Sequence, residues 1–405
     1  MAASVKALVK PELLVWARTS AHLRVDEAAH KAQVKEDQLT AWERGEGQPS
    51  IPQLRKLSRA YKRPLAVFYL PRPPRTFEPL RDFRRLPEGA VGQQSPELAY
   101  EIRRARYRRD VALDLYRERM GEDPQPFTLT ATLDEDPEEV ASRLRAYLGV
   151  TREEASGWRT AYEALNRWRS ALEDRAVLVF QAEDVSVSEM RGFSISETVF
   201  PAVVVNMKDA PAARVFSMLH ETTHLMLHDG GVCDALDETL PDEERAEVFC
   251  NRVAGATLVP AEWLLQEDVV RGQPGPRWSD ETLMVLAQRY RVSREVVIRR
   301  LLLLGRTTEA FYKKKRRQLQ AEFEAKQEED LQKRALGLVA PGFVTPDRVA
   351  VSTAGPLFVR LVLNSYNQEK ITSNDLSSFL EVRLKHVQKI AQAVLRRSMP
   401  PGATA

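Results

Sequence analysis

Apolar residues recur at helical spacing through the first 70 residues of the chain. The stretches "PELLVWARTS", "VDEAAHKA", "EDQLTAWERG" and "SIPQLRKLSRAY" each place their apolar side chains on one face of a short helix. Residues 71–94 are rich in proline, which cannot continue a helix because it lacks the backbone N–H. The pattern predicts an all-α domain over residues 1–70 and a linker over residues 71–94.

The helical pattern returns after the linker and is interrupted once by a β pattern. "ELAYEIRRARYRRDVALDLYRERM", "VASRLRAYLG" and "GWRTAYEALNRWRSALEDR" are typical of helices. Ala176–Phe180 and Pro201–Met207 are rich in β-branched residues, which favour strands. The helix "AARVFSMLHETTHLMLH" and a second helix at about Glu243–Leu258 follow. Residues 95–265 are therefore predicted to form an α+β domain.

The last third of the chain is again helical in pattern. "ETLMVLAQRYRVSREVVIRRLLLLG" predicts two amphipathic helices around a short turn, and "KKKRRQLQAEFEAKQEEDLQKR" predicts a charged, solvated helix; both belong to residues 266–340. Residues 341–405 predict a C-terminal helical region of two or three helices, separated by residues that suit helix caps. The expected fold class is mainly α with a small β-sheet.

Composition narrows the class of protein. The 405 residues are too many for one compact core, so two to four domains are expected. A net charge of +3 restricts any nucleic-acid surface to a local patch. The two cysteines, Cys233 and Cys250, do not make a disulfide framework. Because the chain shows neither a signal-peptide core nor an apolar run of roughly 18 residues, we expect a cytoplasmic protein with no membrane partner.

Two histidines four residues apart, His220 and His224, predict a metal site on the helix that contains them. Positions i and i+4 lie on the same helical face, so both imidazoles can reach one ion. Glu221 is about 100° further round the helix, beside the ion, where its carboxylate can take a proton from water. This H-E-x-x-H pattern is typical of zinc peptidases. The alternative, a chance match, is expected in roughly one chain in a hundred.

A catalytic zinc ion needs a third protein ligand and one open position. The nearby residues with suitable donor atoms are Asp229, Asp234, Glu243, Glu244, Glu247, His228 and the two cysteines. Glu247 is the best placed of these, because it begins the helical stretch "EVFCNRVAGATLVP" and shares one face of the second helix with Cys250, Asn251 and Ala254. Cys250 is the alternative ligand, although a free cysteine among apolar residues is more often buried filler.

His228 lies a second i+4 step along the first helix. Its position is about 80° away from His220 around the axis, so we expect it to line the pocket or cap the helix end. His228 and Asn251 are the candidates for stabilising the transition state. The strand around Val203–Val205 is the candidate for holding an extended substrate by β-augmentation.

The sequence resembles the ImmA/IrrE-type zinc metallopeptidases over about residues 140–305. The matching stretches are "RGFSISETVFPAVVVNMKDAPAARVFSMLHETTHLMLH" and "EVFCNRVAGATLVP". The second stretch carries Glu247, the Cys250-Asn251 pair, Ala254 and a Leu-Val-Pro end, and it is not generic to zinc peptidases. The resemblance implies a zincin-like fold of the α+β class.

The same resemblance implies the roles of the site residues. His220, His224 and Glu247 would bind zinc, Zn2+, and Glu221 would be the general base. It also implies that the substrate is a protein, a repressor cleaved in a stress response.

The N-terminal domain resembles the Xre-type helix-turn-helix in "VDEAAHKAQVKEDQLTAWERGEGQPSIPQLRKLSRAY". The first helix of the motif would be Val25–Lys31 and the reading helix Lys35–Arg44. Fusions of this module to an ImmA/IrrE-type peptidase share "KRPLAVFYLPRPP" and "DFRRLP", so this resemblance covers nearly the whole chain. The candidates for contact with double-stranded DNA are Lys35, Glu36, Asp37, Gln38, Thr40 and Arg44.

The charge of this domain favours DNA binding, with one departure. Residues 1–70 hold 12 Lys and Arg against 7 Asp and Glu, a balance of +5. Glu36 and Asp37, however, stand where a reading helix normally meets base edges. Carboxylates can accept a hydrogen bond from cytosine but are repelled by phosphates. Binding of a protein partner is therefore the alternative use of this domain.

Two further basic segments have open interpretations. The arginines within residues 103–109 form either a second phosphate-binding face or a solvated one. "LAQRYRVSREVVIRRLLLLG" resembles a second helix-turn-helix, of a kind that looks structural in the ImmA/IrrE family. Arg294, Arg299 and Arg300 leave DNA binding open there.

Three functions compete at this point. The leading hypothesis is a regulatory zinc endopeptidase joined to a helix-turn-helix domain. The second is a DNA-binding repressor or antitoxin-like regulator with a structural or sensory zinc site, and the third is an interaction scaffold. Glu221 argues against the last two, because a structural site does not need a general base. The oligomeric state is not fixed by the sequence, and a dimer is allowed.

Overall fold

The structure is a computed structural model that describes residues 6–21, 23–63, 65–73, 95–228, 242–273, 275–336 and 345–398. Most of the predicted linker, residues 74–94, and the loop after His228 lie outside these ranges. The chain divides into two compact units, residues 1–107 with 184–190 and residues 108–183 with 191–405. No helix in the described ranges is long and apolar enough to cross a membrane.

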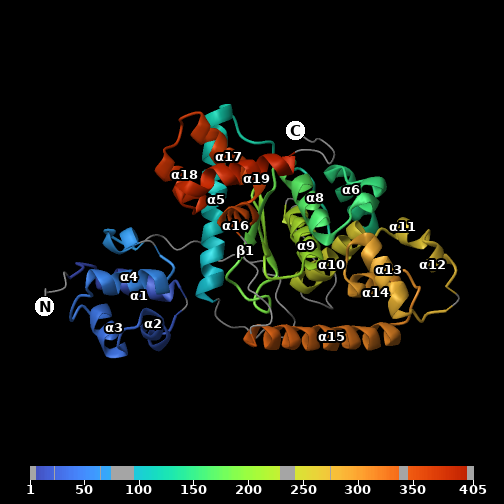
Figure 1. Cartoon of the computed structure of the whole chain (residues 1–405), viewed down its shortest axis with the longest axis horizontal. Coiled ribbons are helices and arrows are strands. Elements are labelled where there is room, and N and C mark those ends of the chain that lie inside the picture. The colour runs from blue at the N-terminus through green and yellow to red at the C-terminus, as the bar shows by residue number, and fades with distance from the viewer. Residues whose placement is uncertain are drawn as a thin grey trace. The chain divides into compact units, whose positions relative to one another are not determined.

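The first unit contains a small helical domain (Figure 1). Its elements are α1 (Pro11–Thr19), α2 (Val25–Ala32), α3 (Glu36–Glu43), α4 (Ile51–Ala60) and the 3-10 helix η1 (Leu65–Tyr69). Gln33 ends α2 in a left-handed conformation, with φ 55°, and its N–H bonds to the carbonyl oxygen of Ala29. This cap turns the chain into α3. The core between the helices includes Leu39, Trp42 and Leu54, as the apolar pattern predicted.

The second unit is built on a three-stranded sheet with the order β1-β3-β2. β1 (Leu178–Ala182) is parallel to β3 (Ala202–Asn206), and β2 (Gly192–Ile195) is antiparallel to it. The β-branched runs predicted β1 and β3 to within two residues at each end. They did not predict β2, because "GFSI" has no β-branched run. Every residue of the three strands is buried.

Helices pack around this sheet and carry most of the core. α8 (Ala161–Glu173) precedes β1, while α9 (Pro211–His228) follows β3 and packs against α8, β2 and β3. α10 (Asp242–Leu258) packs against α9 and against α6 (Pro137–Leu148). The helix α9 therefore lies between α8 and α10 (Figure 1). The other helices before β1 are α5 (Pro96–Met120) and α7 (Arg152–Gly157).

The chain after α10 is entirely helical in the described ranges. Its elements are α11 (Ala261–Leu265), α12 (Asp268–Arg271), α13 (Asp280–Tyr290), α14 (Arg294–Leu303), α15 (Glu309–Ala335), α16 (Pro346–Ala354), α17 (Pro356–Asn367), α18 (Ser373–Leu380), η2 (Leu384–His386) and α19 (Val387–Ser398). Residues 345–398 contain four α-helices, where the pattern predicted two or three. The prediction missed α16, because "PDRVAVSTA" is rich in β-branched residues with low helix propensity. One hydrophobic core runs from Phe127 to Tyr312 and includes side chains of α13 and α14.

Gly355 alone joins α16 to α17. Its φ of 85° and ψ of 137° suit glycine and strain any residue with a side chain. A Cβ atom there would lie 2.7 Å from the carbonyl oxygen of Val179 and 3.0 Å from Oε1 of Glu173. The other oxygen of buried Glu173 accepts the N–H of Leu357 at 2.9 Å. Gly355 therefore lets the C-terminal helices pack directly on β1 and α8.

Replacing Gly355 with alanine will lower the free energy of unfolding by roughly 2–4 kcal/mol, from backbone strain plus the clash with Val179. The matched control is Gly149→Ala. Gly149 also has a positive φ, 69°, but nothing lies within 4 Å of its Cβ position. The control should lose only about 1 kcal/mol. Urea unfolding measures both, and equal losses would contradict the packing argument.

Candidate metal centre

The helix α9 places the two histidines of the motif on its inner face. His220 is fully buried and His224 is 5% exposed. Their Nε2 atoms lie 3.1 Å apart, and the two rings meet at 65°. Because α9 is packed between two helices and the sheet, its polar motif is held inside an apolar environment.

Glu247 on α10 is brought to the same point by the packing of α10 against α9. Its carboxylate oxygens lie 3.4 Å from Nε2 of His220 and 3.2 Å from Nε2 of His224. The Glu247 side chain is 37% exposed, so this corner of the site faces solvent. Among the described residues, His220, His224 and Glu247 are the group of three whose donor atoms all lie within 4.8 Å of one another.

This triangle of donor atoms fits a tetrahedral zinc ion. Bonds of roughly 2.0–2.1 Å to a tetrahedral ion place its ligand atoms about 3.3 Å apart. The two Nε2 atoms lie 3.1 Å apart, and each has an oxygen of Glu247 nearby, Oε2 at 3.4 Å from His220 and Oε1 at 3.2 Å from His224. Two imidazoles and one carboxylate are also the donor set that zinc accepts when a fourth position stays open for water.

The charges at the centre support the same arrangement. Burial disfavours the charged form of His224, but the neighbouring Cys250, Glu247 and Glu221 outweigh that effect and raise its pKa well above the usual value. Burial alone would raise the pKa of Glu247, but hydrogen bonds from the two histidines lower it strongly. The site therefore concentrates negative charge where a cation would bind.

The other predicted alternatives for the third ligand are not brought into this group. Asp229, Asp234 and the side chain of Glu243 lie outside the described residues, and Glu244 is exposed to solvent. Cys250 is fully buried beside His224, and burial raises the pKa of its thiol. Cys250 is not in the group of described residues whose donor atoms lie within 4.8 Å of one another, so the geometry favours Glu247.

Glu221 lies against the strand β2 rather than among the three donor atoms. Its carboxylate accepts a hydrogen bond from the hydroxyl of Ser194 at 3.2 Å, and both side chains are buried. A Cβ atom on Gly192 would lie 3.1 Å from Cγ of Glu221. The strand β2 therefore fixes the position of this carboxylate. Ser194 was missed by sequence reasoning, because no motif marks a serine on an unpredicted strand.

The structure gives little support to the candidates for transition-state stabilisation. The side-chain amide of Asn251 donates to the carbonyl oxygen of Glu247 at 2.7 Å, within its own helix. That contact orients the amide along α10. His228 is the last residue of α9, and its side chain lies outside the described residues.

The predicted docking strand at Val203–Val205 is wrong. These residues belong to β3, which is the central strand and is paired on both sides, with β1 and with β2. Its backbone groups are therefore already used. The strand β2 pairs with β3 along one edge, and no described strand pairs with its other edge. Strand order is a property of the tertiary fold, which the β-branched run did not reveal.

The DNA-binding candidates lie on the exposed face of α3. Lys35, Glu36, Asp37 and Gln38 are exposed at its start, Thr40 is half-buried, and Arg44 is exposed just beyond its end. Two other cations of the domain are used internally. Arg18 makes a bidentate ion pair with Glu43 at 2.7 and 2.9 Å, and Arg63 stacks on Trp16.

The arginines within residues 103–109 form neither of the two predicted faces. Arg104 and Arg108 are buried, and the other three are half-buried. Arg108 donates to the carbonyl oxygen of Thr353, and Arg109 donates to that of Val199. Charged residues at helical spacing suggested side chains on the protein surface. The guanidinium groups of Arg108 and Arg109 instead donate hydrogen bonds to backbone carbonyl groups.

The second helix-turn-helix-like segment, α13 with α14, also uses its arginines internally. Arg300 is 2% exposed, donates to the carbonyl oxygen of Val259 at 2.8 Å and pairs with Glu138 at 2.5 Å. Arg294 pairs with Glu322, and Arg299 donates to the hydroxyl of Tyr312. These contacts make the segment part of the packed core of the second unit.

Two family models match parts of the chain. Residues 173–302 match the IrrE N-terminal-like domain of the Peptidase_M78 family. Residues 14–68 match a helix-turn-helix model. A comparison with curated proteins finds no match.

A solved structure, described as a Mycobacterium tuberculosis transcriptional regulator, is similar at 16% identity with a TM-score of 0.31. The match covers 48% of this chain and 51% of that one, so the chain spans about half the length of that regulator. The domain assignment rests on the two family models and not on this structural similarity. The chain joins an N-terminal helix-turn-helix domain of the Xre type to a Peptidase_M78 domain of the IrrE/ImmA type.

Proposed function

We propose that this protein is a regulatory zinc-dependent endopeptidase that cleaves a repressor in a stress response. The main support is the triangle of donor atoms from His220, His224 and Glu247, with Glu221 buried beside it and not part of it. A structural zinc site is usually closed by four protein ligands. Here the described residues supply three ligands, and the carboxylate of Glu221 lies beside them as a candidate base.

The proposed chemistry divides between the ion and the chain. A bound zinc ion would lower the pKa of a water molecule at its open position towards about 7. Glu221 would act as the general base, taking a proton from the attacking water and giving it to the leaving amine. Ser194 donates a hydrogen bond to Glu221 and holds the carboxylate in a fixed position. Burial of Glu221 strengthens these electrostatic effects, because bulk water is excluded.

The outer edge of β2 is the proposed docking edge for the substrate. An extended peptide can add to a free strand edge through main-chain hydrogen bonds. Gly192 and Ser194 of this strand both approach Glu221. A peptide bound along β2 would therefore run beside the proposed base.

A second candidate function is a DNA-binding repressor whose metal is structural or sensory. Its support is the exposed face of α3, where the side chains of Lys35, Gln38 and Arg44 make no hydrogen bond or ion pair with another described residue. In the leading proposal the same face brings the peptidase to its regulatory target in the cytoplasm. The two functions differ in whether a protein is cut.

Capture of the substrate decides between them. Glu221→Gln protein, immobilised and loaded with zinc, is expected to retain the repressor from a lysate of stressed cells. The captured repressor is then incubated with unchanged protein, with and without a chelator. The proposal requires defined fragments that a chelator prevents. An intact repressor, together with zinc-dependent binding of operator DNA by this chain, would support the second function.

Replacing Glu36 and Asp37 with glutamine will raise affinity for random duplex DNA by on the order of tenfold at low salt. The reason is that two repulsive charges leave the exposed start of α3. Glu12→Gln, an exposed change on α1, is the control and should have little effect. Fluorescence anisotropy at two salt concentrations measures both. Absence of binding at low salt by the folded protein would mean that α3 contacts a protein partner.

A further inference from the structure

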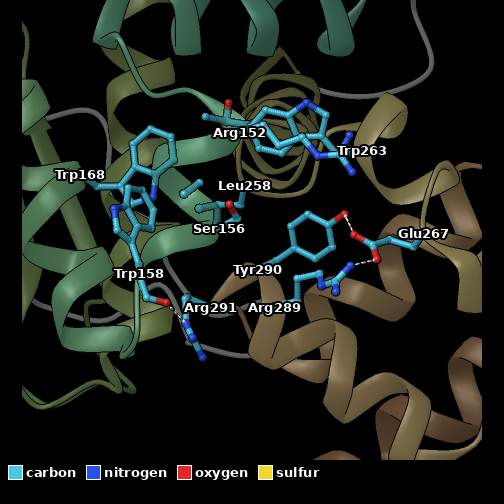
Figure 2. Close-up of a pocket in the computed structure, with 12 residues that line it drawn as sticks. Arg152, Ser156, Trp158, Trp168, Leu258, Trp263, Glu267, Arg289, Tyr290 and Arg291 are labelled. Carbon is cyan, nitrogen blue, oxygen red and sulfur yellow. Dashed lines mark hydrogen bonds and ion pairs between the residues drawn. The ribbon is translucent and has the colours of Figure 1, made fainter.

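The second unit contains a cavity of about 500 Å³ that the metal centre does not use (Figure 2). Its walls come from α7, α8, the end of α10, α11 and α13. Thr257 and Leu258 bring α10 to the cavity ten residues after Glu247, which is about 15 Å along a helix. The cavity and the metal centre are therefore separate sites, and the volume is in the range that small molecules occupy.

Four of the twelve residues that line the cavity are aromatic. Trp158 and Trp168 pack edge to face at one side, with their ring centres 5.8 Å apart. Trp263 and Tyr290 come from α11 and α13, and Figure 2 shows them across the cavity from the first pair. Flat apolar surfaces on opposing walls favour a flat ring as the ligand.

The charged groups at this cavity leave an excess of positive charge. Its one lining carboxylate, Glu267, is held by Arg289 and by the hydroxyl of Tyr290 at 3.1 Å. Arg291 uses Nε to donate to the carbonyl oxygen of Trp158 at 2.8 Å. Its two terminal nitrogens have no carboxylate within ion-pair distance among the described residues.

Arg152 is the third guanidinium group of the wall. It donates to the amide oxygen of Gln266 at 2.6 Å, which is a neutral partner. It is half-buried and, in the described ranges, also has no carboxylate within ion-pair distance. Arg152 and Arg291 are therefore two cations on one aromatic cavity whose charge a ligand can balance.

We propose that this cavity binds a small molecule that carries an aromatic ring and an anionic group. The ring packs between Trp158, Trp168 and Trp263, and the anion pairs with Arg152 and Arg291. An arene carboxylate and a purine nucleotide both have this chemistry. The inference is independent of proteolysis, because none of these side chains belongs to the metal centre.

Calorimetric titration of the whole protein with indole-3-carboxylate and with AMP tests the proposal, with neutral indole as the reference probe. At least one anion is expected to bind saturably and at least about tenfold more tightly than indole, because its charge forms hydrogen bonds with the guanidinium groups. Tighter binding of indole-3-carboxylate would identify the ligand class as arene carboxylates, and tighter binding of AMP would identify it as purine nucleotides. Failure of both anions to bind better than indole would overturn the proposal.

Variants of the cavity wall complete the test. Arg152→Gln should weaken the anion roughly tenfold and leave indole unchanged. The control is Arg159→Gln, the same change at an exposed residue outside the cavity wall, which should alter neither probe. Ser156→Trp, which fills the cavity, should abolish binding of every probe. Equal anion affinity in Arg152→Gln and Arg159→Gln, with unchanged melting temperatures, would also overturn the proposal.

Discussion

Glutamine in place of Glu221 will leave zinc bound and the fold intact but reduce cleavage of the captured repressor by about 10²–10⁴-fold. The amide has nearly the size of the carboxylate, and Glu221 is not one of the three grouped donors. Ser194 can still donate to the amide oxygen. Only acceptance of the proton is lost, so the reduction should appear in kcat, with KM and metal content unchanged.

Two further variants show whether the effect belongs to Glu221 itself. Glu244→Gln makes the same change at an exposed position on α10 and should cleave at the unchanged rate. Ser194→Ala should fall between the two, because the base remains but loses its hydrogen bond. A normal cleavage rate in Glu221→Gln protein would reject the assignment of the base.

Alanine in place of Glu247 will weaken zinc binding by on the order of a hundredfold or more. The remaining imidazoles cannot complete the triangle of donor atoms, so the ion loses one of three bonds to the chain. Since Glu247 is 37% exposed, this variant should keep its fold. His220→Ala and His224→Ala should lose most of the metal. Metal analysis gives the stoichiometry, expected to be about one zinc per chain, and chelator competition gives the affinity.

Glu244→Ala is the control for this second experiment, because it removes an exposed carboxylate from the same helix. It should hold zinc as tightly as the unchanged protein. If Glu247→Ala holds zinc equally tightly, the third ligand is another residue. Cys250, beside His224, or Asp234, outside the described residues, would then be the next to test.

The three site residues that lie on α9 could be predicted from the sequence alone. His220, Glu221 and His224 are fixed relative to one another by helical geometry, so their spacing is sufficient. Glu247 depends on how α10 crosses α9. Local pattern placed it on the correct helix face, and the family resemblance implied its role. The structure brings its carboxylate to the histidines.

Features that depend on tertiary contacts could not be predicted in this way. Arg108 was assigned to one of two surface roles, because a guanidinium group is costly to bury unless carbonyl groups accept its hydrogen bonds. Those acceptors, such as Thr353, lie more than 200 residues away in the sequence. The cavity walls are similarly distant, with Trp158 and Tyr290 separated by more than 100 residues.

Strand order was the remaining failure, and it has the same cause. The apolar run of β3 correctly indicated a buried strand, but a buried strand can be central or lateral. β3 is central because β2 pairs with its second edge. β2 itself could not be predicted, because its sequence, GFSI, contains glycine and serine and has no run of β-branched residues. The site favours glycine at position 192, because a Cβ atom there would lie only 3.1 Å from Glu221 and from the carbonyl oxygen of Val204.

The buried contacts of Arg300 decide where this protein can be cut into fragments. Removing α13 and α14 would take from Glu138 its ion pair with Arg300 and would leave the carbonyl group of Val259 without the guanidinium donor. It would also expose the apolar residues that α13 and α14 add to the common core, which extends to Tyr312. Shuffling of these helices between proteins as a free-standing module is therefore disfavoured. A truncated form that retains a folded metal centre has to reach at least as far as Tyr312.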